Sequence, residues 1–148
     1  MSRKERIKQE IKEFNEWKGT INCEGNPQEY DPVWNVTLGG PIDSPYVGGK
    51  FKIRITLPEG YPNSKPTFEF LTDICHINIK GKQICLDSLN DNNYNPDYSI
   101  MQMLTQIFMM LTSPNEDSPL NWDYYQLYSK DIDAYFEKAR EMTRQFAK

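Results

Sequence analysis

The sequence predicts a single α+β domain in which one helix precedes a run of strands and further helices follow. Apolar residues recur at helical spacing near the N-terminus and in the last third of the chain, and they alternate with polar residues in between. A parallel α/β fold would instead alternate strands with helices. At 148 residues the chain can bury a core without disulfides or metals, so we assign residues 1–148 to one domain.

Composition and charge exclude several classes of function. The net charge of -4 gives no basic footprint for nucleic acid, and no apolar run is long enough to span a membrane. The N-terminal residues are charged throughout and do not resemble a signal peptide. Three cysteines, an odd number, argue against a secreted disulfide framework. We therefore expect an intracellular protein, in the cytoplasm or the nucleus, with free thiols.

The first predicted element is an amphipathic helix over residues 3–17. Ser2 followed by Glu5 matches a capping box, and one apolar stripe follows at helical spacing: Ile7, Ile11 and Phe14. The polar face carries five basic side chains: Arg3, Lys4, Arg6, Lys8 and Lys12. Such a face is either simply solvated or a docking surface for an acidic partner.

Strands are predicted in the middle of the chain. Two of them show apolar–polar alternation, marked by Trp34, Val36 and Leu38 and by Phe51, Ile53, Ile55 and Leu57. Phe68 and Phe70 indicate a third strand, and residues 20–25 a weaker fourth. The segments GGPIDSPYVGG and PEGYPNSKP are rich in the Gly and Pro of hairpin turns. Because one face is apolar and the other polar, we expect an antiparallel sheet covered on one side.

The last third is predicted to be helical. Ser99 caps a segment that is apolar nearly all round and therefore buried, marked by Ile100, Met103, Leu104, Ile107, Phe108 and Leu111. A C-terminal helix is marked by Ile132, Tyr135, Phe136, Ala139, Met142 and Phe146. Residues 72–98 show neither period, and an irregular segment of that length is usually functional.

This irregular segment contains CHINIKGKQICLD, with two cysteines and the only histidine of the chain. Zinc needs four ligands, usually in closely spaced pairs, whereas Cys75, His76 and Cys85 supply three at most. A Cys75–Cys85 disulfide is disfavoured in a reducing compartment. A thiol–imidazole pair would have to use His76, and nothing else in the chain supports that mechanism. A lone histidine is more often a hydrogen-bonded structural residue.

A third interpretation is a thiol that carries an acyl group without a local general base. Attack of an amine on the resulting thioester requires an oxyanion stabiliser and a way to handle the proton of the amine. Asn78 has the amide donor for the first task, and carboxylates at Asp87 or in NEDSP would orient a lysine. The alternative is that Asn78 forms a turn and Cys85 is a small buried residue. The pattern alone leaves both interpretations open.

Over essentially its whole length the chain resembles the ubiquitin-conjugating enzymes. The resemblance rests on segments in a fixed order: the N-terminal helix, VWNVTLGGP, GGPIDSPYVGGKFKIRITLPEGYP, KPTFEF, His76-x-Asn78, ICLD, Tyr94-x-Pro96, SPNEDSPLN and the C-terminal helix. It implies a four-stranded antiparallel sheet flanked by helices, in a monomer that needs no metal or organic cofactor. It also implies a ubiquitin-activating enzyme that consumes ATP, ubiquitin ligases and substrate proteins as partners.

The resemblance implies a role for each matching residue. Cys85 would form the thioester with the C-terminal glycine of ubiquitin and pass ubiquitin to a lysine amine. Asn78 would stabilise the oxyanion or hold the active-site loop, and His76 would be structural. Ser118 falls at the position that receives the incoming lysine, with Asp87 and Asp117 as its neighbours. The basic helix, through Arg3, Lys4, Arg6 and Lys8, resembles the surface that binds the activating enzyme and ligases.

Several positions depart from the family pattern. Ile77 stands where the family has proline, whose ring fixes φ, and the loop from Asn78 to Cys85 is one residue short. Ligase contacts also differ, because Asn63 replaces a common Phe, Tyr94 a Trp, and Asp97 a small residue after Pro96. Hydrophobic anchors dominate such interfaces, so we expect weak or altered binding to common RING ligases.

Serine at position 118, where relatives also have aspartate, would lower lysine reactivity or open a phosphorylation switch. Two rival functions remain, and the altered His76-Ile77-Asn78 motif supports the first of them. One is a catalytically silent relative that acts as a ubiquitin-binding scaffold, and the other is conjugation of a different ubiquitin-like modifier.

Overall fold

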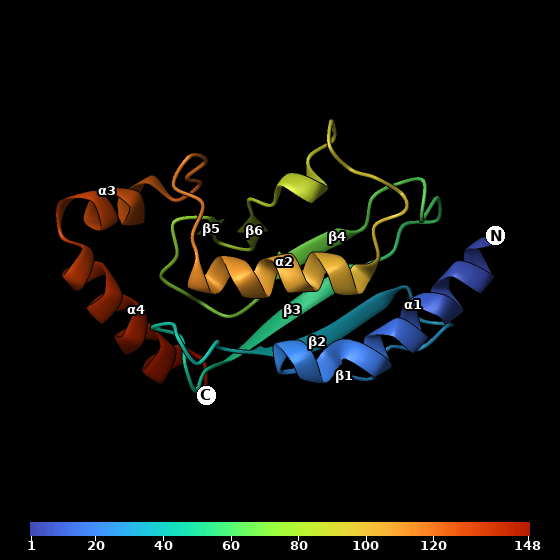
Figure 1. The fold of residues 1–148 in the computed structure, drawn as a ribbon, viewed down its shortest axis with the longest axis horizontal. Helices are drawn as coiled ribbons and strands as arrows, with labels where there is room; N and C mark the ends of the chain where they lie inside the picture. Colours follow the sequence, from blue (N-terminus) through green and yellow to red (C-terminus); the bar gives the residue numbers. More distant parts are fainter.

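The computed structural model describes residues 1–148 and confirms the predicted α+β order (Figure 1). Its helices and strands are α1 (Arg3–Trp17), β1 (Cys23–Gly25), β2 (Val33–Gly39), β3 (Lys50–Thr56), β4 (Thr67–Phe70), β5 (Ile79–Lys80), β6 (Gln83–Ile84), α2 (Ile100–Thr112), α3 (Trp122–Lys130) and α4 (Ile132–Phe146). Two 3₁₀ turns, η1 (Lys18–Ile21) and η2 (Asp87–Leu89), complete the chain. None of the helices combines the length and the apolar character needed to cross a membrane.

Strands β1 to β4 form one antiparallel sheet in sequence order, as the alternation predicts. Val36 lies opposite Ile53, which lies opposite Phe70, and all three side chains are buried on the helix-covered face. The weak strand predicted over residues 20–25 is shorter, because residues 18–21 form η1 and Asn22 adopts a left-handed φ of 51°.

Helices α1 and α2 lie together in front of the sheet, whereas α3 and α4 lie at its other end (Figure 1). Gly25 of β1 lets α1 pack closely against the sheet. A Cβ at this position would lie 2.9 Å from the Val36 side chain and 3.3 Å from the Phe14 side chain. Helix α2 begins at Ser99 with a complete capping box, and most of its side chains are buried. The predicted core helix is therefore confirmed.

Two elements escape the sequence patterns. Helix α3 buries none of its residues fully, so its apolar side chains form no regular stripe. It is separated from α4 only by Asp131, whose side chain accepts a hydrogen bond from the Ala134 N–H and caps α4. The hairpin of β5 and β6 has two residues in each strand, which is too short for any period to appear.

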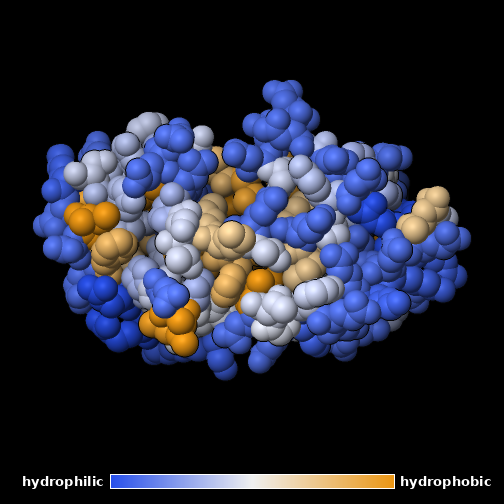
Figure 2. Space-filling view, in the orientation of Figure 1, coloured by the Kyte–Doolittle hydropathy of each residue, from blue (hydrophilic) through white to orange (hydrophobic).

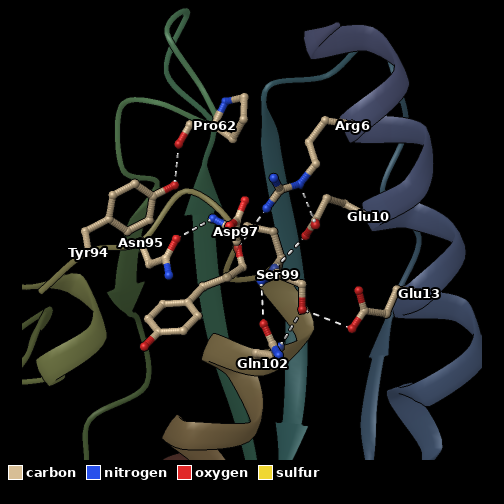
Figure 3. A network of polar contacts seen from close by, with 11 residues as sticks. Arg6, Glu10, Glu13, Pro62, Tyr94, Asn95, Asp97, Ser99 and Gln102 are labelled. Carbon is tan, nitrogen blue, oxygen red and sulfur yellow. Dashed lines mark hydrogen bonds and ion pairs between the residues drawn. The ribbon is translucent and has the colours of Figure 1, made fainter. Parts of the chain in front are cut away.

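A network of polar contacts joins α1 to the start of α2 (Figure 3). It includes Arg6, which the sequence predicts to lie on the exposed basic face of α1. The side chain of Arg6 is 12% exposed, forms an ion pair with Glu10 at 3.0 Å and donates to the Tyr98 carbonyl at 2.8 Å. Glu10, which is 4% exposed, also accepts from the N–H of Ile100 at 2.5 Å. Arg6 therefore holds the start of α2 and is not part of an exposed surface.

Replacement of Glu10 by alanine should lower the free energy of unfolding by about 3 kcal/mol, because the buried Arg6 and the Ile100 N–H would lose their partner. Glu10→Gln should cost less, since burial raises the pKa of the carboxyl and a neutral acceptor still fits. Urea unfolding measures both values. Glu16→Ala, an exposed carboxylate on the same helix, is the matched control. Equal effects at positions 10 and 16 would contradict the structural role of this network.

Candidate active site

The irregular segment contains a tight hairpin that brings Asn78 and Cys85 side by side. Gly81, at the first central position of the two-residue turn, has a φ of 60°, as a type II′ turn requires. Ile79 pairs with Ile84, and the Cys85 N–H donates to the Asn78 carbonyl at 2.9 Å. Asn78 and Cys85, which are separated by six residues in the sequence, are therefore in direct contact in the fold.

The three cysteines lie in different environments and form no disulfide. Cys23 and Cys75 are 3% and 0% exposed, and burial raises the pKa of each thiol to about 12. Cys85 is partly exposed, so it is the thiol that a protein partner can reach. No cluster of three or more His, Cys, Asp or Glu side chains is arranged to bind a metal ion.

Cys85 lines a groove between the segment that follows it in the chain and α2. The groove has a volume of about 650 Å³ and is lined by Cys85, Leu86, Asp87, Ser88, Asn93, Tyr98, Gln106, Met109, Met110, Ser113 and Asn115. Hydrophobic surface gathers in this central region of the face, over α2 (Figure 2). Partial burial and the nearby charge of Asp87 both raise the pKa of Cys85. The thiol is therefore largely protonated at neutral pH.

Replacement of Asp87 by asparagine should accelerate alkylation of Cys85 by iodoacetamide at pH 7.5, because loss of the nearby negative charge lowers the pKa of the thiol and favours the reactive thiolate. In the unmodified protein the rate should rise with pH until the thiol is ionised. Mass spectrometry of the alkylated peptide measures both effects. Asp43→Asn, at an exposed carboxylate in the loop between β2 and β3, is the control. Slower alkylation of the Asp87 variant would contradict this electrostatic account.

His76 is fully buried and both of its ring nitrogens are occupied. Nε2 donates to the Met110 carbonyl at 2.8 Å, and Nδ1 accepts from the Asn78 N–H at 2.9 Å. Burial lowers the pKa of the imidazole to about 4. His76 is therefore neutral at pH 7 and has no free nitrogen to take a proton from Cys85.

The side chain of Asn78 is also buried and fully engaged. Its Nδ2 donates to the carbonyls of Asn115 and Ser118, each at 3.0 Å, while its Oδ1 accepts from the Asn115 N–H at 2.9 Å. Both amide hydrogens are thus committed to the loop that follows α2. This geometry favours the loop-holding role of Asn78 over that of an oxyanion donor.

The loop that Asn78 holds carries the exposed Asp117 and Ser118. The Asp117 N–H donates to Oδ1 of Asn115 at 3.0 Å, which fixes the turn. Tyr128 of α3 donates to the Glu116 carboxylate, and this bond raises the pKa of Tyr128 to about 12. Sequence reasoning missed Tyr128 because it lies on the helix that shows no regular stripe.

The predicted partner-binding residues lie on two neighbouring loops and on α1. Tyr94 donates to the Pro62 carbonyl at 2.6 Å, which brings the loop with Pro96 and Asp97 beside that with Asn63 (Figure 3). Asn63 and Asp97 are exposed, and Pro96 is half-buried.

The other basic residues of α1 that the sequence predicts to bind partners differ in solvent exposure and in their contacts within the protein. Lys4 is exposed, and Lys8 is exposed with Glu29 at 3.8 Å. Arg3 is half-buried and donates to the Pro58 carbonyl at 3.3 Å. The side of the molecule formed by α1 is almost entirely hydrophilic (Figure 2).

The sequence model of the ubiquitin-conjugating enzyme family matches residues 6–143. The chain belongs to this family. It is 36% identical over 109 residues to ubiquitin-conjugating enzyme E2 2 of Mycosarcoma maydis, a match that covers 73% of this chain and 58% of that relative. Among solved structures, the E2 domain of a Toxoplasma gondii ubiquitin conjugating enzyme superposes with a TM-score of 0.88 at 27% identity. That superposition covers 99% of this chain and all of the Toxoplasma domain, and it confirms the predicted fold of the ubiquitin-conjugating enzymes.

Proposed function

We propose that this protein accepts ubiquitin from the activating enzyme as a thioester on Cys85 and transfers it to a lysine amine, usually with a ubiquitin ligase. The observation that carries the proposal is the position of Cys85. It is the one partly exposed thiol of the chain, it lines the groove beside α2, and its backbone is bonded to Asn78.

In the first step the Cys85 sulfur attacks the thioester carbonyl of ubiquitin on the activating enzyme. A new C–S bond forms, the old C–S bond breaks, and the Cys85 proton passes to solvent or to the leaving thiolate. No local base is needed, because the attacking and leaving thiols are alike. This suits a site in which His76 has no free ring nitrogen.

In the second step a lysine amine attacks the Cys85 thioester, the C–N bond forms, and the Cys85 thiolate leaves. The amine must first lose a proton from an ammonium whose unperturbed pKa is about 10.4. We assign the approach of the lysine to the side of Asp87 and of the loop with Asp117 and Ser118. Asn78 serves this step by holding that loop, since both of its amide hydrogens bind loop carbonyls.

Partners and compartment follow from the same chemistry. Asn63 and Asp97 offer polar side chains on the two loops tied by Tyr94, so binding to RING ligases is weak or altered. Lys4 and Lys8, exposed on α1, contact the activating enzyme. A working free thiol requires a reducing compartment, which is the cytoplasm or the nucleus.

A second candidate is a ubiquitin-binding scaffold with little catalytic power. The committed amide of Asn78 favours it, because no side-chain donor of that residue remains free for an oxyanion. The two candidates differ in discharge: an enzyme loses its ubiquitin to free lysine at a measurable rate, whereas a silent scaffold does not.

The decisive experiment incubates the protein with activating enzyme, ATP and ubiquitin. We expect a reductant-sensitive adduct one ubiquitin heavier, followed by its decay when free lysine is added. Parallel reactions with other ubiquitin-like modifiers and their activating enzymes identify the modifier. Absence of an adduct with every modifier would contradict the enzymatic function.

A further inference from the structure

The turn between His76 and Asn78 contains a buried backbone N–H that proline would lack. Ile77 is 0% exposed, and its N–H donates to the hydroxyl of Tyr135 at 3.1 Å. Its carbonyl accepts from the N–H groups of Leu120 and Asn121 at 2.8 and 2.9 Å. A buried N–H must find a partner within the protein, and Tyr135 is the residue that supplies it here.

Tyr135 itself is held rigidly. It lies on α4, is 1% exposed, and packs edge-to-face against Tyr128 with ring centroids 5.0 Å apart. Its hydroxyl neighbours that of Tyr46, which donates to the Cys75 carbonyl at 2.6 Å. Two buried tyrosine hydroxyls thus hold the backbone from Cys75 to Ile77, one from the loop before β3 and one from α4.

Asn78, the residue after Ile77, connects the backbone held by Tyr46 and Tyr135 to Cys85. Asn78 binds Cys85 through its backbone carbonyl and the 115–118 loop through its side chain. A displacement of Ile77 therefore moves the thiol and the loop together. A misplacement of about 1 Å is enough to slow an oriented reaction strongly.

We propose that Tyr135 is a positioning residue of the thioester site. By accepting the Ile77 N–H, its hydroxyl fixes Asn78 and supplies the restraint that a proline ring would supply through its fixed φ. The inference rests on the proposed function, because the rate it controls is the transfer of ubiquitin from Cys85. The effects of residues 77 and 135 on the transfer rate should therefore be coupled, because the Tyr135 hydroxyl has a backbone partner only when residue 77 carries an N–H.

The test compares Tyr135→Phe, Ile77→Pro and the double variant in discharge of preloaded ubiquitin to free lysine, at a temperature where all are folded. Tyr135→Phe should slow discharge about tenfold, because a buried N–H is left unpaired and Asn78 shifts. In the Ile77→Pro background the same change should alter the rate less than about twofold. Tyr125→Phe removes an α3 hydroxyl that has no hydrogen-bond partner, and it should keep the wild-type rate.

Equal losses in both backgrounds, or a Tyr135→Phe rate within about twofold of the wild type, would overturn the proposal. Failure of the unmodified protein to form any thioester would instead reject the proposed function. Amide hydrogen exchange gives a readout independent of activity and of variant folding. The Ile77 amide of the unmodified protein should exchange as slowly as the core strand amide of Ile53, and rapid exchange would overturn the proposal equally.

Discussion

Replacement of Cys85 by alanine should abolish the reductant-sensitive ubiquitin adduct completely. The other two thiols cannot substitute for it, because Cys23 and Cys75 are buried and burial raises their pKa to about 12. A buried thiol of that pKa is almost entirely protonated at pH 7.5 and out of reach of a protein-bound thioester. Denaturing gels with and without reductant measure the adduct.

The matched controls are Cys23→Ala and Cys75→Ala, which should both still load ubiquitin. Cys85→Ser should trap ubiquitin as an ester that survives reductant, because a serine oxygen replaces the thioester sulfur. Loss of the adduct in either control variant, while Cys85→Ala retains it, would show that the wrong cysteine has been assigned.

Replacement of Asn78 by alanine should damage stability and transfer together. The change leaves the Asn115 N–H and the carbonyls of Asn115 and Ser118 without their present partner. We expect a loss of about 2–4 kcal/mol in the free energy of unfolding. The melting temperature should fall by about 2–4 °C for each kcal/mol lost. Discharge to free lysine should slow by about 100-fold, because the loop no longer holds its place beside Cys85.

These two readouts separate the possible roles of Asn78. If Asn78 were only an oxyanion donor, Asn78→Ala would keep the melting temperature and load ubiquitin normally while discharge slowed. If it holds the loop, loading and melting temperature fall as well. Asn26→Ala, at an exposed asparagine before β2, controls for general effects of the substitution and should change neither. A variant at Asn78 with wild-type stability and wild-type discharge would refute both roles.

The sequence alone determined the elements that rest on local periodicity. Helix α1 matches the predicted range of residues 3–17, and the capping box at Ser99 marks the start of α2. The alternation about Trp34 and Ile53 predicts both the strands and the face that is buried. These features are readable because each residue follows the period of its own helix or strand and the burial of one face.

Only the tertiary structure decided the features that depend on distant partners. The hairpin of β5 and β6 has no period to read, yet it brings Asn78 to Cys85. Arg6 lies at a position that the helical period of α1 predicts to be polar and exposed. Its side chain is nevertheless mostly buried, because it donates a hydrogen bond to the carbonyl of Tyr98, 92 residues away. The hydrogen bond from Ile77 to Tyr135 spans 58 residues. No local pattern records which distant group will satisfy a buried polar atom, because that choice is made by packing.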